Sequence, residues 1–174
     1  MDQNYKNLVD KVDSKFEQIV EKYGDQMVCQ KGCFQCCKAD LSVSEVEWRA
    51  IKEFASDNLT TLKKAKRKND KNQCEFLDED GGCLIYPVRP IICRSHGAPI
   101  LYKSEETDGD LSKDVCPLNF SRKPLEEVDD QCFINVELVN TILAMTNQMA
   151  TGEKQRKKLL FAALMDEITG EHLN

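Results

Sequence analysis

The sequence predicts a mainly α-helical fold, in which a small helical domain surrounds a cysteine-rich, loop-rich centre with at most a short hairpin. Three observations lead to this prediction. Apolar residues recur at steps of three and four near both ends of the chain, which is the spacing of an amphipathic helix. Glycine and proline are frequent between residues 72 and 120, where no helical period is visible. Of the nine cysteines, all but one lie between residues 29 and 116.

Length and charge narrow the classes of protein to which the chain can belong. Its 174 residues predict a single domain over residues 1–174, because domains typically comprise about 100–200 residues. The net charge of −6 argues against non-specific nucleic-acid binding. No stretch approaches the roughly 20 apolar residues of a membrane-spanning helix, and the N-terminus lacks the apolar segment of a secretory signal. We therefore expect a cytoplasmic protein that does not enter a membrane.

The first expected element is an amphipathic helix over residues 3–23. Its apolar positions form one stripe: Tyr5, Leu8, Val9, Val12, Phe16, Ile19, Val20 and Tyr23. Gly24 follows as a residue at which the helix can stop. Residues 25–40 show no clear period, so we expect a loop there.

A second helix is expected to begin near Ser42, where two overlapping capping boxes occur. Ser42 with Glu45 has the three-residue spacing at which two side chains bond to each other's main-chain N–H groups. Ser44 with Glu47 has the same spacing, and the sequence does not choose between the two pairs. The inward face of this helix is expected to comprise Val46, Ala50, Ile51 and Phe54.

A third helix is expected after Asn58, which would cap it, and Leu59 and Leu62 are expected to face inward. This helix leads into a basic run at residues 63–71. Such a run is either a nucleic-acid contact or a solvated helix end, where cations are favourable. No aromatic residue interrupts the run to stack on bases. We therefore favour the solvated helix end and expect no nucleic-acid partner.

Beyond the basic run, the chain is expected to be irregular up to about residue 120. Gly81 and Gly82 indicate a tight turn that would bring Cys74 close to Cys83. Residues 83–86 could form one short strand. Metal ligands would hold together a loop-rich stretch of this length.

Helical spacing returns in the C-terminal third. One helix is expected over about residues 133–150, followed by an interruption at Gly152 and a last helix that ends at Gly170. The C-terminal helices therefore occupy residues 133–169, and the cysteine-rich module between the outer helices occupies about residues 25–120.

The cysteines are expected to bind metal rather than to form disulfides. Their number is odd, and the cytosol keeps thiols reduced. Four fall within nine residues, which is too dense for thiols that only fill space in a core. The candidate ligands are Cys29, Cys33, Cys36, Cys37, Cys74, Cys83, Cys93 and Cys116. Cys132, by contrast, is expected to be a plain buried thiol.

Zinc and iron–sulfur clusters both take four thiolates, so eight cysteines suffice for two four-cysteine sites or one larger cluster. Arg89 and Arg94 flank Cys93, where guanidinium groups would bond to sulfur ligands or, alternatively, form surface salt bridges. His96 is a ligand, a donor to a ligand, or a ring packed in a loop. We place all three side chains next to the ligands rather than on the metal.

The order of these residues resembles the YkgJ-type family of zinc- or iron-chelating domains, which carries a CxxCxxCC-type signature. The resemblance spans residues 29–94, and it includes Cys116 if its Cys-Pro is the trailing cysteine of the family. The matching residues are Cys29, Cys33, Cys36, Cys37, Cys74, Phe76, Leu77, Cys83, Ile85, Tyr86, Arg89, Pro90, Cys93 and Arg94. The resemblance implies a metal, zinc or iron. One branch of the family is similar to flagellin lysine N-methylases, which carry this module in a longer chain.

These observations favour one function and leave two alternatives. We expect a cytosolic metal-binding protein that chelates zinc or iron through its clustered cysteines, with an iron–sulfur cluster as one form of the iron. The first alternative is an enzyme that uses the metal centre, either a methylase relative or a redox protein. The chain lacks a glycine-rich loop for S-adenosylmethionine, so a non-catalytic role is favoured. The second alternative is a nucleic-acid module, against which the acidic charge argues.

Overall fold

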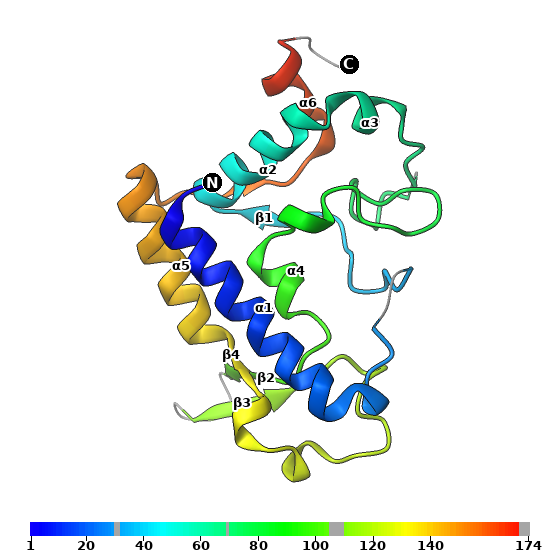
Figure 1. Ribbon diagram of the computed structural model, residues 1–174, viewed down its shortest axis with the longest axis vertical. Coiled ribbons are helices and arrows are strands. Elements are labelled where there is room, and N and C mark those ends of the chain that lie inside the picture. Colours follow the sequence, from blue (N-terminus) through cyan, green and yellow to red (C-terminus); the bar gives the residue numbers. More distant parts are fainter. Residues whose placement is uncertain (30–31, 69, 105–109, 171–174) are drawn as a thin grey trace. The chain divides into compact units, whose positions relative to one another are not determined.

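The computed structural model describes residues 1–29, 32–68, 70–104 and 110–170, and it is mainly α-helical (Figure 1). These residues divide into two compact units, each assembled from separate stretches of the chain. Unit 1 comprises Met1–Asp2, Lys31–Pro90 and Asn147–Asn174, and unit 2 comprises Gln3–Gln30 and Ile91–Thr146. That both units belong to one domain stays a prediction. No helix in the described ranges is long and apolar enough to cross a membrane.

Unit 2 is built on the long N-terminal helix. α1 (Gln3–Tyr23) has the predicted bounds, and its buried residues belong to the predicted stripe: Tyr5, Leu8, Val9, Val12 and Ile19. Val20, which was also predicted on that stripe, is exposed. The short helix α4 (Ile91–Ser95) lies along α1 (Figure 1). A 3₁₀ helix over Gly24–Gln26 follows α1 and leads towards the first cysteine.

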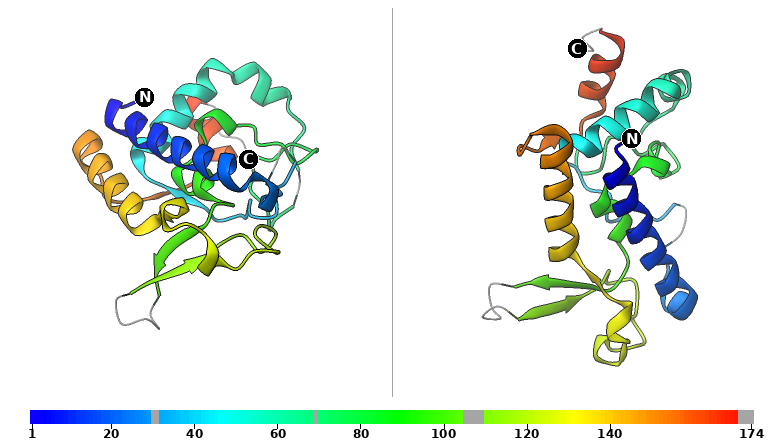
Figure 2. Two further views of the ribbon diagram at one scale, coloured as in Figure 1. Left: turned by 60° about the horizontal axis from the view of Figure 1, so that its bottom comes forward. Right: turned by 60° about the vertical axis from the view of Figure 1, so that its left-hand side comes forward.

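A small sheet in unit 2 exceeds the hairpin that the sequence predicts. β2 (Ile100–Lys103) and β3 (Leu111–Asp114) are antiparallel neighbours, and Figure 2 shows this pair extending as a ribbon. β4 (Ile134–Asn135) pairs with β2 in parallel. The expectation of at most one short hairpin was therefore wrong, because a two-residue strand leaves no alternation to detect. Because β4 was not predicted, its residues were assigned to the following helix. α5 (Val136–Thr151) therefore begins three residues later than predicted.

The core of unit 2 lies between α1, the segment after α4 and β4. Its buried members are Ile19, Ala98, Phe120, Val128, Cys132, Phe133 and Ile134. Two 3₁₀ helices, Leu125–Glu127 and Asp130–Cys132, lead into it. Cys132 is therefore a buried thiol within an apolar cluster, as predicted.

Unit 1 combines helices with a minimal two-stranded sheet. Its elements are β1 (Ser42–Val43), α2 (Glu45–Asp57), α3 (Leu59–Lys64), a 3₁₀ helix over Tyr86–Val88, β5 (Lys157–Lys158) and α6 (Phe161–Thr169). β1 and β5 are antiparallel, and α2 packs against α6 (Figure 1). Its core comprises Val43, Trp48, Ile51, Ala55, Leu62, Phe76, Ile85, Val88, Leu159, Phe161, Leu164 and Met165.

The structure decides which capping box starts α2. Glu47 Oε2 accepts hydrogen bonds from the main-chain N–H and the hydroxyl of Ser44, both at 2.8 Å. Asn58 does not cap α3 with its side chain, because its amide donates to the Phe54 carbonyl and closes α2 instead. The two C-terminal stops are confirmed: Gly152 and Gly170 follow α5 and α6 with φ of +73° and +69°.

A polar cluster joins α2, β5 and α6 within unit 1. The indole N–H of Trp48 donates to Glu167 Oε2 at 3.1 Å, and Lys52 Nζ donates to the same oxygen at 3.1 Å. Lys157 Nζ lies 2.9 Å from Glu45 Oε2 and 3.7 Å from Glu167 Oε1. The two carboxylates are thus each shared between cations or N–H donors.

This cluster predicts an acid-sensitive part of the stability of unit 1. Burial raises the pKa of Glu167, but hydrogen bonds from Trp48 and Lys52 outweigh it and bring the pKa below its ordinary value. Stability gained from a lowered carboxyl pKa is present above about pH 4.3 and is lost as the pH falls further. We expect Glu167→Gln to remove about 1 kcal/mol or less of unfolding free energy at neutral pH. It should also make unfolding less acid-dependent below about pH 5.

The single tryptophan, Trp48, reports this transition by fluorescence in urea titrations at several pH values. Glu127→Gln is the matched control, because Glu127 pairs with Lys123 at an exposed position in unit 2, whereas Trp48 belongs to unit 1. Equal acid dependence in wild type and Glu167→Gln would contradict the assignment.

Candidate metal centre

The first cysteine loop packs onto the turn that carries the second cysteine group, within unit 1. Phe34 lies against Gly81 so closely that a Cβ atom on Gly81 would be 2.3 Å from Phe34 Cδ1. Gly81 has a φ of +81°, which also favours glycine. Lys68 covers the same ring, with Nζ 3.8 Å from its centroid. Phe34 therefore anchors the loop that carries Cys33, Cys36 and Cys37 beside the second group.

Main-chain hydrogen bonds join the same two segments. The N–H of Cys74 donates to the carbonyl of Cys37 at 3.0 Å, and the N–H of Ala39 donates to the carbonyl of Asn72 at 3.2 Å. This antiparallel pairing brings the last cysteine of the first loop next to the first cysteine of the second group. Sequence spacing alone left open which cysteines would be neighbours.

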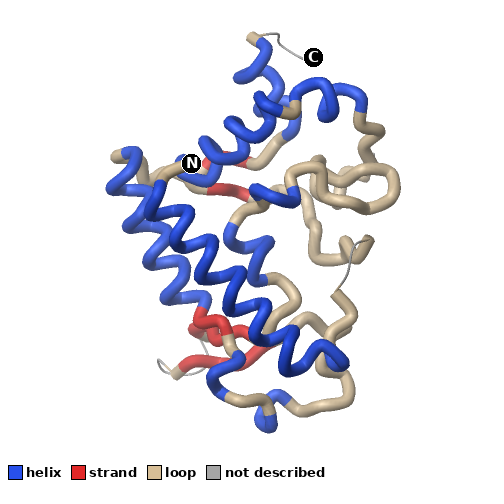
Figure 3. The backbone as a smooth tube through the Cα atoms, viewed as in Figure 1, coloured by secondary structure: helices blue, strands red, loops and turns tan. Residues whose placement is uncertain are grey.

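The predicted Gly81–Gly82 turn is confirmed. Leu77 and Cys83 face each other in an antiparallel bridge, and the N–H of Asp78 donates to the Gly82 carbonyl at 2.9 Å. The Asp78 carboxylate accepts the Gly82 N–H at 2.6 Å and closes the turn. The strand predicted over residues 83–86 was wrong, because Tyr86 begins a 3₁₀ helix. Figure 3 shows the stretch after α3 largely as loop.

The sulfurs of Cys74 and Cys83 occupy equivalent surroundings. Burial raises the pKa of each thiol above its ordinary value, while a main-chain N–H two residues later opposes this rise. The donor is Phe76 for Cys74 and Ile85 for Cys83. The Cys74 thiol also contributes to the raised pKa of Cys83. N–H groups directed at sulfur stabilise the thiolate form in which cysteine binds metal.

Arg89, which the sequence predicts next to Cys93, influences Cys83 of this pair. Its guanidinium stacks on the Tyr86 ring at 4.1 Å from the centroid and donates to the Tyr86 carbonyl at 3.1 Å. Burial is the larger influence and raises the pKa of Cys83, whereas the positive charge of Arg89 opposes this rise. Arg89 therefore supplies positive charge to a candidate ligand.

The basic run is used to build this site. Residue 69 lies outside the described residues. Among the others, Arg67 forms an antiparallel main-chain β-bridge with Asp78, and its guanidinium lies 3.9 Å from the centroid of the Phe161 ring. The main-chain N–H of Lys68 donates to the Leu77 carbonyl at 2.9 Å. The run thus forms one side of the hairpin that carries Cys74 and Cys83. Lys63 and Lys64 do end α3, as predicted.

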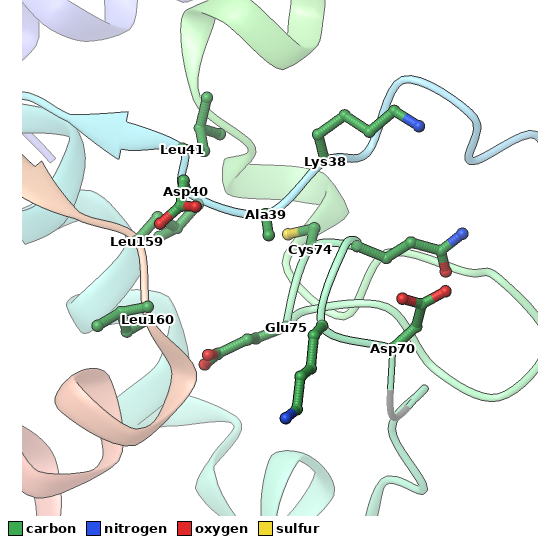
Figure 4. Close-up of a pocket in the computed structure, with 11 residues that line it drawn as sticks. Lys38, Ala39, Asp40, Leu41, Asp70, Cys74, Glu75, Leu159 and Leu160 are labelled. Carbon is green, nitrogen blue, oxygen red and sulfur yellow. The ribbon is translucent and has the colours of Figure 1, made fainter.

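A pocket of about 160 Å³ opens beside Cys74 within unit 1 (Figure 4). Cys74 lies next to Ala39 in it, whereas Glu75 is directed towards Leu160. Glu75 Oε2 accepts the N–H of Phe161 at 2.7 Å and so caps the start of α6. The carboxylate nearest in sequence to Cys74 is therefore occupied in holding the fold.

Cys29 and Cys116 belong to unit 2, where Asn119 connects them. Asn119 Nδ2 donates to Cys29 Sγ at 3.2 Å and to the Gly97 carbonyl at 2.7 Å. Its main-chain N–H donates to the Cys116 carbonyl at 2.8 Å. Gly97 has a φ of +95°, and a Cβ atom there would be 2.6 Å from Cys29 Sγ. The Cys29 sulfur is therefore confined by a donor and by a glycine.

The remaining predicted residues lie on and after α4 in unit 2. Cys93 is half-buried on this helix. Arg94 is 3 % exposed and forms an ion pair with Asp13 on α1, so its salt bridge is partly buried. His96 is exposed in the turn after α4, which rules out a packed ring.

Three residues that shape these sites were not predicted. Phe34, Gly97 and Asn119 act through contacts between segments far apart in the sequence. Gly97 carried a signal, since a glycine after a short helix often adopts a positive φ. Asn119 follows Cys116 by three residues, and nothing in that local pattern indicates a bond to Cys29.

The donor chemistry fits zinc or iron. All nine cysteines lie in the described residues and are thiols. Within those residues, no three side chains of His, Cys, Asp or Glu are gathered closely enough to hold a metal ion as they stand. Unit 1 nevertheless contains a thiol pair with N–H donors and a docked loop that carries further cysteines. Soft thiolate donors of this kind select zinc or iron over hard cations.

Comparison with known proteins agrees with this chemistry. The family model CxxCxxCC, described as a putative zinc- or iron-chelating domain, matches residues 28–117. No curated protein and no solved structure matches the chain. The matched region contains the eight predicted ligand cysteines and ends just after Cys116. The chain belongs to the CxxCxxCC family of putative zinc- or iron-chelating domains.

Proposed function

We propose that this protein binds zinc or iron through cysteine thiolates, and that Cys74 and Cys83 are the central ligands in unit 1. The supporting observation is the equivalent placement of their sulfurs, each facing a main-chain N–H two residues on. Cysteines of the loop that Phe34 anchors complete the ligand set. Four thiolates suit both a zinc ion and an iron–sulfur cluster.

The role that this arrangement supports best is structural or metal-handling. The hairpin around Cys74 and Cys83 contains little regular secondary structure, so metal binding would contribute directly to its folding free energy. The surrounding helices have apolar cores of their own. We therefore propose that the metal organises the cysteine-bearing loops, while the helices fold without it. A reducing compartment, the cytosol, is proposed for the protein because thiolates must remain reduced to bind metal.

Metal content tests the proposal directly. We expect protein purified without oxygen to contain stoichiometric zinc or iron by elemental analysis. A colourless sample would indicate zinc, whereas a brown one with matching sulfide would indicate an iron–sulfur cluster. Metal-free protein that is fully folded would overturn the proposal.

Chelation gives a second, local test. Removal of the metal should increase amide hydrogen exchange across residues 66–83, while α1 and α2 keep their protection. Apolar burial, rather than metal, stabilises those helices, so they are the internal control. Unchanged exchange across 66–83 after verified metal removal would contradict the proposed ligands Cys74 and Cys83.

A further inference from the structure

Asn119 is a buried amide whose every polar atom is used. It is 2 % exposed. Its Oδ1 accepts the main-chain N–H of Val28 at 2.8 Å, and its Nδ2 donates to the Gly97 carbonyl at 2.7 Å and to Cys29 Sγ at 3.2 Å. One side chain thus ties the segment that carries Cys29 to the turn after α4.

The orientation of this amide follows from its partners. The N–H of Val28 can only donate, so the amide oxygen must face it, and the carbonyl of Gly97 can only accept, so the amide nitrogen must face that side. Cys29 Sγ therefore receives a hydrogen bond rather than giving one.

Two further features hold the sulfur in place. The main-chain N–H of Phe120 donates to the Gln26 carbonyl at 2.8 Å, which fixes the segment after Asn119 to the 3₁₀ helix that follows α1. Gly97 leaves no room for a side chain beside Cys29 Sγ. The sulfur consequently has a defined position within unit 2.

We propose that Asn119 is a positioning residue for Cys29, holding its sulfur in place within unit 2 for metal binding. The metal-binding part rests on the proposed binding of metal by cysteine thiolates, and it takes Cys29 of unit 2 as a ligand in addition to those proposed in unit 1. Asn119 lies two residues beyond the region that the family model matches. Residues around the cysteines therefore extend the site past its signature.

A double-mutant cycle tests whether Asn119 acts through Cys29. Asn119→Asp keeps the size of the side chain and an acceptor for Val28, but it removes the N–H that faces sulfur. We expect it to weaken zinc binding by about 10–100-fold, the usual effect of losing a group that orients a ligand. In the Cys29→Ala background the same substitution should change affinity less than about twofold. Competition with a chromophoric chelator measures all four affinities.

A spectroscopic readout separates positioning from general stability. With Co(II) as the probe, the sulfur-to-cobalt charge-transfer band should move to lower energy in Asn119→Asp, because a thiolate without its hydrogen bond gives up an electron more easily. If that variant does not fold, Asn119→Ala, which removes the same donor without adding a charge, replaces it. Equal losses of affinity in both backgrounds, or an unmoved band, would overturn the proposal.

A metal-free measurement distinguishes this proposal from the proposed function. In the apo protein, the side-chain amide signals of Asn119 in ¹⁵N–¹H spectra should shift in Cys29→Ala and stay unchanged in Cys132→Ala. Failure of wild type to bind metal, with this shift present, would remove the proposed function and leave the hydrogen bond standing. Metal binding unaffected by Cys29→Ala would remove only the role of Asn119.

Discussion

Cys83→Ala is expected to lose metal and to loosen the cysteine-bearing hairpin, whereas Cys132→Ala is expected to do neither. Burial raises the pKa of the Cys83 thiol, whereas the Ile85 N–H and the positive charge of Arg89 oppose that rise. Losing one of four thiolates should weaken metal binding by more than the 10–100-fold typical of an outer-shell partner, so we expect a loss above about 100-fold.

Cys132→Ala is a matched control because it also removes a sulfur atom. Cys132 is 7 % exposed and packs among the apolar side chains of unit 2. Its replacement should cost about 1–2 kcal/mol of packing without loss of metal. Metal content by elemental analysis and melting temperature with and without chelator measure both effects. Retention of full metal content by Cys83→Ala would contradict the ligand assignment.

Gly81→Ala is expected to detach the first cysteine loop from the hairpin, at a cost well above that of Gly152→Ala. Both glycines have a positive φ, +81° and +73°, so both alanines pay a similar backbone strain of about 1–2 kcal/mol. Only Gly81 faces a neighbour, since its Cβ would lie 2.3 Å from Phe34, whereas nothing lies within 4 Å at Gly152. The additional cost at Gly81 should be about 1–3 kcal/mol, as for overpacking.

The difference between these two variants isolates the contact that anchors the loop. We expect Gly81→Ala to lower metal affinity as well as unfolding free energy, because the loop supplies ligands. Gly152→Ala should lower only the unfolding free energy. Urea titration and chelator competition provide the two measurements. If the two alanine variants showed the same loss of stability and full metal affinity, Phe34 would not be the anchor.

Local patterns predicted the helices well. The apolar stripe of α1, the N-terminal cap of α2 and the stop of α6 at Gly170 depend on residues within one or two turns of each other, so their signals are complete within a short window. The capping box shows the limit of such signals. Ser42 and Ser44 both matched the capping-box pattern. Ser44 caps α2 because Ser42 belongs to β1, which pairs with a strand more than 100 residues later.

Local sequence patterns did not predict the short strands or the residue with which Arg94 forms its ion pair. β4 and β5 are two residues long and exist only because other strands lie beside them. Arg94 is buried against Asp13, although its position next to Cys93 indicated a role at sulfur. Such pairings depend on the path of the chain through space, and that path leaves no periodic trace in either segment.

The sequence by itself determined that this is a mainly helical protein of a zinc- or iron-chelating family, because cysteine spacing and helical period are local properties. It also determined the turn at Gly81–Gly82, since two adjacent glycines favour a turn through their own backbone conformations. Only the tertiary structure decided which cysteines are neighbours. Phe34 on Gly81 and Asn119 on Cys29 are contacts between distant segments, and their stability comes from close packing and buried hydrogen bonds that form once the chain has folded.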